Sequence, residues 1–314
     1  MVSKVISAAP IGYEAEIIDV EGDSSKGLPG LQIVGMGNKA IDEAKERVRS
    51  AIKNSMLDFP AKKIVINLAP AELPKDGTFF DLPIAISILT LSGQIKQHEI
   101  KSKAFIGELS LSGELRPVKG IINILEKLRN SGINEVFIPL DNLESSSLID
   151  GIKIIAAKNL KEIFLHLKGE KTIANQIIEH NHEKAQNQTE LDDIIGQEQA
   201  KRALTIAIAG HHNILLTGPP GTGKTMLAQA ALNLLPNLSK EEILEVLKIH
   251  GLVEDVDSKI SRPFRTPHHT ASKVSIIGGG SKALPGEISL AHNGVLFLDE
   301  MPEFPKSVLE SLRQ

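Results

Sequence analysis

Apolar and polar positions in the first part of the chain follow the periods of strands and helices in turn. Residues 13–17 alternate as a half-buried strand does, and residues 31–34 and 64–68 are short apolar runs bounded by turn residues. Between these runs, apolar side chains fall on one face of a helix that begins at Asn38, a favourable N-cap residue. Interleaved strands and helices of this kind predict an α/β fold.

The same succession of elements continues to about residue 168. An apolar helix is predicted from Asp81 to residue 91, and residues 104–118 are predicted to form a hairpin that turns at Ser112 and Gly113. The remaining predicted elements are a helix over 119–130, a strand over 135–138 and a helix over 160–167. We therefore place the first α/β domain at residues 1–168.

A polar segment separates this domain from the rest of the chain. Residues 169–190 hold few large apolar side chains and many Glu, Lys, Asn and Gln, which is typical of a linker. We interpret its histidines, His180 and His182, as a solvated pair and not as a metal site, because positions i and i+2 diverge on a helix. The second domain then covers residues 191–314.

The second domain contains a complete G-x-x-x-x-G-K-[ST] phosphate loop. A strand is predicted before it, over residues 213–217, and a helix after it, from Lys224 to residue 235. Backbone N–H groups and the helix N-terminus bind phosphate, Lys224 reaches the β- and γ-phosphates, and Thr225 ligates Mg²⁺. The motif predicts ATP and Mg²⁺ as cofactors. Its residues are Gly218, Pro219, Pro220, Gly221, Thr222, Gly223, Lys224 and Thr225.

A second acidic motif follows further along the domain. Residues 295–298 form an apolar run of strand type that ends in Asp299 and Glu300, the Walker B arrangement. In a parallel sheet, the carboxyl end of such a strand lies beside the phosphate loop. Asp299 is then placed to join Thr225 in holding Mg²⁺, and Glu300 to polarise the water that attacks the γ-phosphate. We therefore predict Glu300 as the catalytic residue of a nucleotide hydrolase.

The segment between the two motifs is rich in Gly and Pro, which predicts a loop or hairpin region without helices over residues 262–294. Two of its residues, His268 and His269, are interpreted as anchors of the loop and not as metal ligands, because neighbouring side chains in an extended loop point apart. Four cations of this region are candidate phosphate contacts, with a solvated loop as the alternative. They are Arg262, Arg265, Lys273 and Lys282.

Composition restricts the function further. The 314 residues carry a net charge of -4, so nucleic-acid contacts must use local patches, and the absence of cysteine excludes disulfides and thiolate metal sites. No apolar run is long enough to span a membrane, and the start of the chain has no signal-peptide core, so we expect a cytoplasmic protein. Aromatic residues, at 3%, argue against base stacking as the main mode of nucleic-acid binding.

Part of the first domain resembles the proteolytic domain of Lon-type proteases, a fold of the ribosomal protein S5 domain 2-like kind. The resemblance rests on residues 74–81, 107–113 and 138–142. Lon-type enzymes use a Ser-Lys dyad. Here Phe79 holds the place of the serine nucleophile, and Ile122 holds the place of the lysine. The resemblance implies a fold kept without proteolysis, as a scaffold, a partner-binding surface or an oligomerisation unit.

The stretch 262–294 resembles the magnesium-chelatase branch of AAA+ proteins, and its combination with a Lon-like domain resembles the YifB/ComM family. The resemblance implies an N-terminal Lon-protease-like α/β domain followed by a partial P-loop AAA+ α/β domain. It implies that residues 274–287 form a hairpin that projects towards the pore of a homohexamer. It also assigns Ile194 and Ile195 to a turn that packs on adenine, with a helix-packing staple as an equal alternative.

The function implied by this resemblance is an ATP-driven motor on single-stranded or branched DNA. Its expected work is helicase or branch-migration activity in natural transformation and recombination. Two alternatives are a magnesium-chelatase-like metal-insertion subunit and a non-proteolytic Lon-like scaffold with an ATP switch. AAA+ proteins normally carry a polar sensor, an arginine finger and a lid after Walker B, and Arg313 comes too early to be the finger. We therefore expect a C-terminally truncated chain with weak or no hydrolysis of its own.

Overall fold

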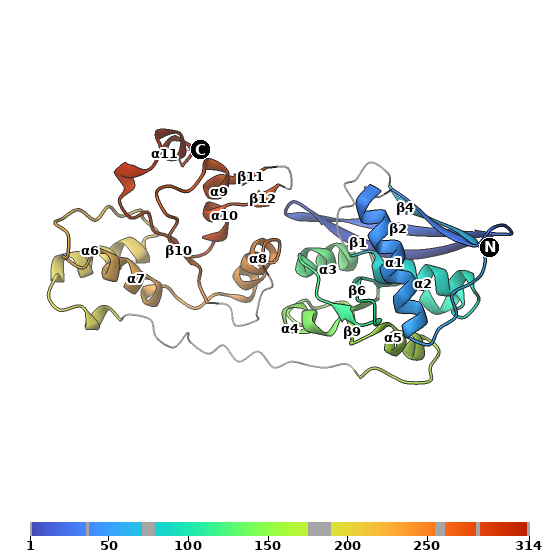
Figure 1. Ribbon diagram of the computed structural model, residues 1–314. Coiled ribbons are helices and arrows are strands. Elements are labelled where there is room, and N and C mark those ends of the chain that lie inside the picture. The colour runs from blue at the N-terminus through green and yellow to red at the C-terminus, as the bar shows by residue number, and fades with distance from the viewer. Residues whose placement is uncertain are drawn as a thin grey trace. The chain divides into compact units, whose positions relative to one another are not determined.

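The computed structural model describes residues 2–35, 38–70, 79–174, 190–254, 261–280 and 283–312. The chain divides into two compact units, one covering residues 1–179 and the other most of residues 180–314. Each unit has its own apolar core. The architecture is mixed α/β, as predicted (Figure 1).

The first unit is built on a seven-stranded sheet of order β3-β4-β2-β1-β5-β8-β9. The long hairpin of β1 and β2 forms its middle and turns at Gly12, whose φ of +57° suits glycine. Strand β2 pairs antiparallel with both β1 and β4, and the other neighbouring pairs of this sheet are parallel. The strands are β1 (Val2–Ile11), β2 (Glu14–Ser25), β3 (Gly30–Val34), β4 (Lys63–Ala69), β5 (Lys103–Phe105), β8 (Glu135–Pro139) and β9 (Lys153–Ala157).

Helices pack on this sheet around α2, in which every residue is buried. Helix α2 contacts β1, β2 and α1, so its apolar sequence reflects burial on all sides and not one amphipathic face. Ala44, Val48 and Ile52 of α1 are fully buried, as the predicted apolar face requires. The helices of the unit are α1 (Asn38–Asn54), α2 (Asp81–Leu91), α3 (Ile121–Asn130), α4 (Leu143–Ser146) and α5 (Leu160–Leu167), with 3-10 turns η1 (Gln97–Ile100) and η2 (Leu140–Asn142).

The predicted hairpin over 104–118 is shorter in the structure. Its strands are β6 (Glu108–Leu109) and β7 (Leu115–Arg116), because Lys103–Phe105 joins the main sheet as β5. The structure also has two strands that the sequence pattern missed, β1 and β9. Strand β1 contains small residues such as Ala8 and Ala9, and β9 ends in two alanines, so neither has the bulky apolar alternation that marks a strand.

The chain remains attached to the first unit for several residues after α5. The backbone N–H of Ile173 donates to Nδ1 of His166 at 2.9 Å, and the Ile173 side chain packs against the core of the unit. Burial lowers the pKa of His166, which favours the neutral imidazole that accepts this bond. The start of the predicted linker therefore packs on the first unit. His180 and His182 lie outside the described residues.

The second unit has helices around two small apolar clusters. One cluster joins Ile194, Leu204 and Leu227, and the other joins Ile276, Phe304 and Val308. Its helices are α6 (Glu198–Ala209), α7 (Lys224–Leu234), α8 (Lys240–His250), α9 (Lys273–Ile277), α10 (Glu287–Leu290) and α11 (Lys306–Ser311), with 3-10 turns η3 (Leu191–Asp193) and η4 (Met301–Glu303). None of the described helices of either unit has the length and apolarity to cross a bilayer.

Strands of the second unit are short. Strand β10 (Phe264–Arg265) pairs parallel with β13 (Val295–Leu296), and β11 (Gly278–Gly279) pairs antiparallel with β12 (Leu284–Pro285). The predicted strand over 213–217 is wrong as a sheet element, since these residues pair with no other described segment. Two apolar side chains of this segment, Ile214 and Leu215, are 40% and 75% exposed.

The glycine- and proline-rich region over 262–294 contains two short helices, which corrects the prediction of a region without helices. The hydroxyl of Ser272 accepts a bond from the backbone N–H of Ser275 at 3.1 Å and so caps α9. Helix α10 follows Gly286 and carries the buried Leu290. The hairpin of β11 and β12 lies between these helices, inside the predicted hairpin over 274–287.

Candidate nucleotide-binding site

The phosphate loop leads directly into helix α7, as the motif requires. Gly221 and Gly223 have φ angles of +79° and +83°, a conformation that side chains with Cβ rarely adopt. A Cβ at either position would have no atom within 4 Å, so it is backbone conformation and not lack of space that requires glycine. The first N–H groups of α7 have no partners within the helix, and they lie at the loop. This arrangement suits an anion.

Two side chains of the loop fold back onto its own carbonyl groups. Nζ of Lys224 donates to the carbonyl oxygens of Gly218 and Pro219, both at 2.9 Å. Oγ1 of Thr222 donates to the same Pro219 oxygen at 2.9 Å. The ammonium is therefore held over the loop, while Thr225 is exposed in the first turn of α7. A cation above a ring of backbone N–H groups is the arrangement that binds a di- or triphosphate.

The turn before α6 lies against this loop. Gln197 has a φ of +59°, and its Nε2 lies 3.4 Å from the carbonyl oxygen of Thr222. Ile194 is 5% exposed and packs with Leu204 and Leu227, which is the contact expected of a helix-packing staple. Ile195 is 98% exposed beside the same turn. The adenine role of both isoleucines stays a prediction.

The Walker B strand packs on the core that supports the loop. Val295 of β13 contacts the cluster that includes Leu227 of α7, and Leu216, just before the loop, contacts the same cluster. Asp299 and Glu300 follow this strand and are both exposed. The backbone N–H of Glu300 donates to Oδ1 of Asp299 at 3.0 Å. The elements that carry the two motifs therefore pack on one apolar cluster, and the two acids of Walker B are accessible.

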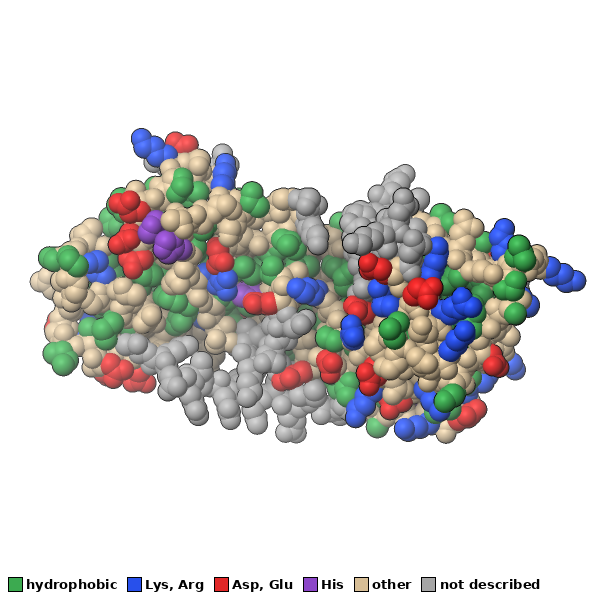
Figure 2. All heavy atoms as spheres, viewed as in Figure 1, with side chains coloured by type: hydrophobic (Ala, Val, Ile, Leu, Met, Phe, Trp, Pro, Cys, Tyr) green, Lys and Arg blue, Asp and Glu red, His purple; other side chains and the backbone are tan. Residues whose placement is uncertain are grey.

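His269 contacts the predicted catalytic carboxylate, a relationship that sequence reasoning missed. Its Nδ1 lies 3.6 Å from Oε2 of Glu300. The rings of His268 and His269 lie against each other with centroids 4.1 Å apart and their planes tilted by 32°, and Nδ1 of His268 lies 2.8 Å from Oγ1 of Thr270. His268 thus has a hydrogen bond within the loop, as predicted, but the expectation that the two neighbouring side chains point apart is wrong, because their rings are in contact. On the face drawn in Figure 2, histidine side chains gather beside acidic ones on the second unit.

The signal for this contact was present in the chain but weak. His269 follows β10 and Glu300 follows β13, and the carboxyl ends of two paired parallel strands lie side by side. Strand β10 is only two residues long, so its pattern did not mark it as a strand. Among the described residues, no group of three or more His, Asp or Glu side chains is arranged to hold a metal ion. Mg²⁺ is usually held by one or two protein ligands together with nucleotide phosphates, so the Mg²⁺ role of Thr225 and Asp299 stays a prediction.

Two of the four candidate phosphate contacts are engaged within the unit. The guanidinium of Arg265 makes two bonds to the carboxylate of Glu287, at 2.7 and 2.9 Å, and holds the pKa of that carboxyl below its usual range. Arg262 bonds two backbone carbonyls and one carboxylate. These contacts argue against a phosphate role for either arginine. Lys273 is exposed, and Lys282 lies outside the described residues.

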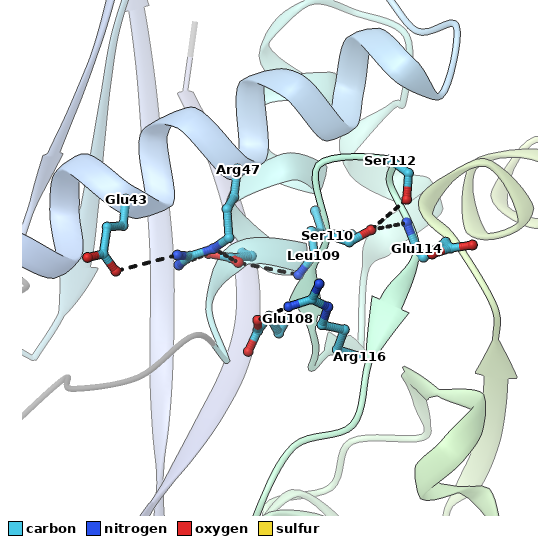
Figure 3. A network of polar contacts seen from close by, with 9 residues as sticks. Glu43, Arg47, Glu108, Leu109, Ser110, Ser112, Glu114 and Arg116 are labelled. Atoms are coloured by element: carbon cyan, nitrogen blue, oxygen red, sulfur yellow. Dashed lines mark hydrogen bonds and ion pairs between the residues drawn. The ribbon is translucent and has the colours of Figure 1, made fainter.

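In the Lon-like unit, an ion pair occupies the start of α2. Nε and Nη2 of Arg47 bond the carboxylate of Asp81 at 2.7 and 3.2 Å, and the backbone N–H of Leu109 donates to it at 3.3 Å. Figure 3 shows Arg47 reaching from α1 towards the loop that carries Glu108 and Leu109. Burial raises the pKa of Asp81 to about 6, against the lowering effect of Arg47. Residues 74–78 of the Lon-like motif lie outside the described residues.

The position of the Lon nucleophile holds a side chain without nucleophilic chemistry. Phe79 is half-buried, its ring meets that of Phe80 edge to face, and its carbonyl oxygen accepts a bond from Gly107 at 3.3 Å. Ile122 and Ile124, in the segment where the Lon lysine is expected, are buried. A phenyl ring and an alkyl chain neither attack a carbonyl nor shuttle a proton.

Two family descriptions match separate parts of the chain. The family described as "Magnesium chelatase, subunit ChlI" matches residues 190–314, and the family described as "Subunit ChlI of Mg-chelatase" matches residues 20–142. A Lon protease from Leptospira interrogans is 28% identical over 158 residues, which are 48% of this chain and 18% of that protein. The protein is thus an AAA+ protein of the magnesium-chelatase type behind a Lon-protease-like domain.

Several curated relatives match nearly the whole chain. Competence protein ComM of Haemophilus influenzae is 44% identical over 317 residues, and the YifB protein of Escherichia coli is 48% identical over 315 residues. Each alignment covers 99% of this chain and 62% of the relative. The chain belongs to the YifB/ComM family. The chain spans 62% of the length of these relatives, so these matches do not by themselves establish the activity of the whole protein.

Proposed function

We propose that this chain is the nucleotide-binding part of an ATP-driven motor. The observation that carries the proposal is the pairing of a complete phosphate loop at the N-terminus of α7 with an acidic pair after β13, both on one apolar cluster. In this proposal the loop residues 218–225 hold ATP, and Thr225 and Asp299 hold Mg²⁺. Glu300 orients and deprotonates the attacking water.

The domain organisation of the proposal has three parts. Residues 1–168 are a Lon-like domain without protease activity, residues 169–190 connect it, and residues 191–314 are the incomplete AAA+ domain. The turn with Ile194 and Ile195 lies against the loop through Gln197, which supports a place for adenine there. We propose assembly as a homohexamer in which the rest of the protein completes each site.

The ATPase proposal is tested in the full-length protein by nucleotide binding and turnover. Lys224→Ala is expected to weaken ATP binding at least about 10-fold, because the ammonium over the loop is lost. Glu300→Gln is expected to bind ATP and to turn it over at least about 100-fold more slowly. Lys306→Ala is the matched control, since Lys306 also opens an exposed helix turn but follows no glycine loop. Normal ATP turnover in Lys224→Ala would contradict the assignment of the phosphate loop as the nucleotide site.

The proposed substrate of the motor is branched or single-stranded DNA. One relative is named a competence protein, and competence involves DNA uptake, so helicase or branch-migration work in natural transformation and recombination follows as a proposal. The decisive assay is ATP-dependent movement of three- and four-way DNA junctions by the full-length protein, with Glu300→Gln as the inactive control. Loss of movement in that variant is expected.

A second candidate is ATP-driven metal insertion, which the magnesium-chelatase match favours. It is tested by adding Mg²⁺ and a free porphyrin, with and without ATP, and following the absorbance of the metalloporphyrin. Metal insertion without junction movement would replace the DNA proposal. A third outcome, in which ATP binds but drives neither reaction, favours the non-proteolytic scaffold with an ATP switch.

A further inference from the structure

The guanidinium of Arg262 joins three separate segments of the second unit. Its Nε donates to the carbonyl oxygen of Pro236 at 2.6 Å, its Nη1 donates to that of Asn293 at 2.7 Å, and its Nη2 lies 3.3 Å from Oε2 of Glu242. The side chain is 11% exposed. A planar guanidinium with its three nitrogen atoms engaged holds these segments in one fixed geometry.

The two carbonyl groups belong to the far ends of the elements that carry the nucleotide site. Pro236 comes two residues after α7, the helix whose first residue is Lys224. Asn293 comes two residues before β13, the strand that leads to Asp299. Arg262 therefore connects the end of the phosphate-loop helix to the beginning of the Walker B strand.

Other contacts fix the same turn before β13. Oε2 of Glu245, on α8, accepts a bond from Nδ2 of Asn293 at 2.9 Å and lies 2.9 Å from Nε2 of His292. The carbonyl oxygen of Pro263, next to Arg262, accepts a bond from the backbone N–H of Val295 at 2.8 Å. The starts of β10 and β13 are thus held together where Arg262 contacts them, so a shift of its side chain would move both strands.

We propose that Arg262 is a positioning residue that sets the spacing between α7 and β13, and with it the placement of the Walker B acids beside the phosphate loop. Helix α7 has 11 residues, so Arg262 acts from about 16 Å beyond the loop and touches neither nucleotide nor water. It acts through two rigid elements. Its effect on hydrolysis rests on the proposed ATPase function, whereas its effect on the spacing does not.

The spacing is tested directly by a distance measurement. The measurement uses the full-length protein, with any cysteine outside residues 1–314 replaced by serine. Residues 1–314 have no cysteine, so Gln229→Cys on α7 and Met301→Cys after Walker B then accept two spin labels at defined places. Both positions are exposed. With Arg262 present, one narrow distance distribution is expected, and Arg262→Gln is expected to broaden it about two-fold or more. Glu242→Gln keeps both carbonyl bonds and is expected to leave it narrow. An unchanged distribution in Arg262→Gln overturns the proposal.

Turnover in the full-length protein separates positioning from a general structural role. For Arg262→Lys and Arg262→Gln, kcat is expected to fall about 10- to 100-fold, while the Kd for ATP stays within about 3-fold. The Kd is expected to stay because the phosphate loop takes its shape from its own residues and not from Arg262. If ATP binding is lost in parallel with turnover, Arg262 is needed only for folding and the proposal fails. If the parent protein hydrolyses no ATP but the label distances respond to Arg262→Gln, the proposed function fails and the positioning role stands.

Discussion

Nδ1 of His269 lies 3.6 Å from Oε2 of Glu300, and the two residues follow the ends of the paired parallel strands β10 and β13. Glu300 has a φ of +51°, so its backbone is already in the left-handed region, which a residue with a Cβ seldom adopts. The imidazole gives the exposed carboxylate a polar neighbour on one side. The ring of His268 contacts that of His269 and bonds Thr270, so it limits the movement of His269.

We expect His269→Ala to lower the ATP turnover of the full-length protein about 10-fold with an unchanged Kd for ATP. The reason is that Glu300 loses the contact that restrains its side chain, while the phosphate loop is untouched. His269→Gln keeps a polar group at this place and is expected to recover part of the rate. Steady-state kinetics and nucleotide titration measure both effects. His98→Ala, at an exposed histidine of the first unit, is the control, and equal loss in both variants contradicts the role.

Gly223→Ala is expected to weaken ATP binding about 10-fold. Gly223 caps α7 with a φ of +83°, in the left-handed region, where a residue with a Cβ is destabilised by about 1 to 2 kcal/mol. With alanine at this position, the loop is expected to relax away from its phosphate-binding shape. The control is Gly251→Ala, because Gly251 has an ordinary helical φ of −60° at the end of α8. Titration with a fluorescent ATP analogue measures both. Equal affinity in the two variants would show that the loop tolerates the change.

Local patterns predicted the elements whose sequence signals are complete within a few residues. Helix α5 forms over the predicted residues 160–167, and the capping box of Ser239 and Glu242 at the start of α8 is likewise a signal contained within a few residues. The loop leads into helix α7 as predicted, and Gly221 and Gly223 have the positive φ angles that favour glycine, whereas the nucleotide role of the loop stays a prediction. Strand 213–217 was not formed as predicted, since a strand also needs a partner and apolar composition does not provide one.

Contacts between distant residues were beyond the reach of the sequence pattern. The bonds from Arg262 to Pro236 and Asn293 join positions 26 and 31 residues away, and they depend on how α7, α8 and β13 pack. The pattern marked Arg262 only as a cation, and an exposed phosphate contact was the natural interpretation of an arginine in a Gly- and Pro-rich loop. Its burial, which no local pattern encodes, changes that interpretation to a structural one.

The stability of the first unit should depend on the ionisation of Asp81. Burial raises its pKa from 3.8 to about 6, so between these values the native state binds a proton that the unfolded state does not. The associated stabilisation is fully present below pH 3.8 and is lost as the pH rises through about 6. From about pH 7.5 down to about pH 4.5, the free energy of unfolding of the parent is expected to rise by about 2 kcal/mol relative to Asp81→Asn.

Urea unfolding at the two pH values measures this difference. Tyr13 is the single tyrosine of the chain, which has no tryptophan, and it lies in the first unit, so its fluorescence follows the unfolding of that unit. Effects of acid on all other groups are common to the parent and Asp81→Asn, and they cancel in the comparison. The same pH dependence in both proteins would contradict the raised pKa of Asp81.

Arg47→Met is expected to destabilise the first unit by about 3 to 5 kcal/mol at about pH 7.5, because it leaves the Asp81 carboxylate buried without its cation. At about pH 4.5 the carboxyl is protonated, so the loss should be smaller by about 2 kcal/mol or more. Glu43→Gln is the matched control, since Glu43 is 57% exposed and lies 3.8 Å from the same arginine. It is expected to cost less than about 1 kcal/mol. A loss in Arg47→Met that does not change with pH would mean that packing of the arginine, and not its charge, supports this unit.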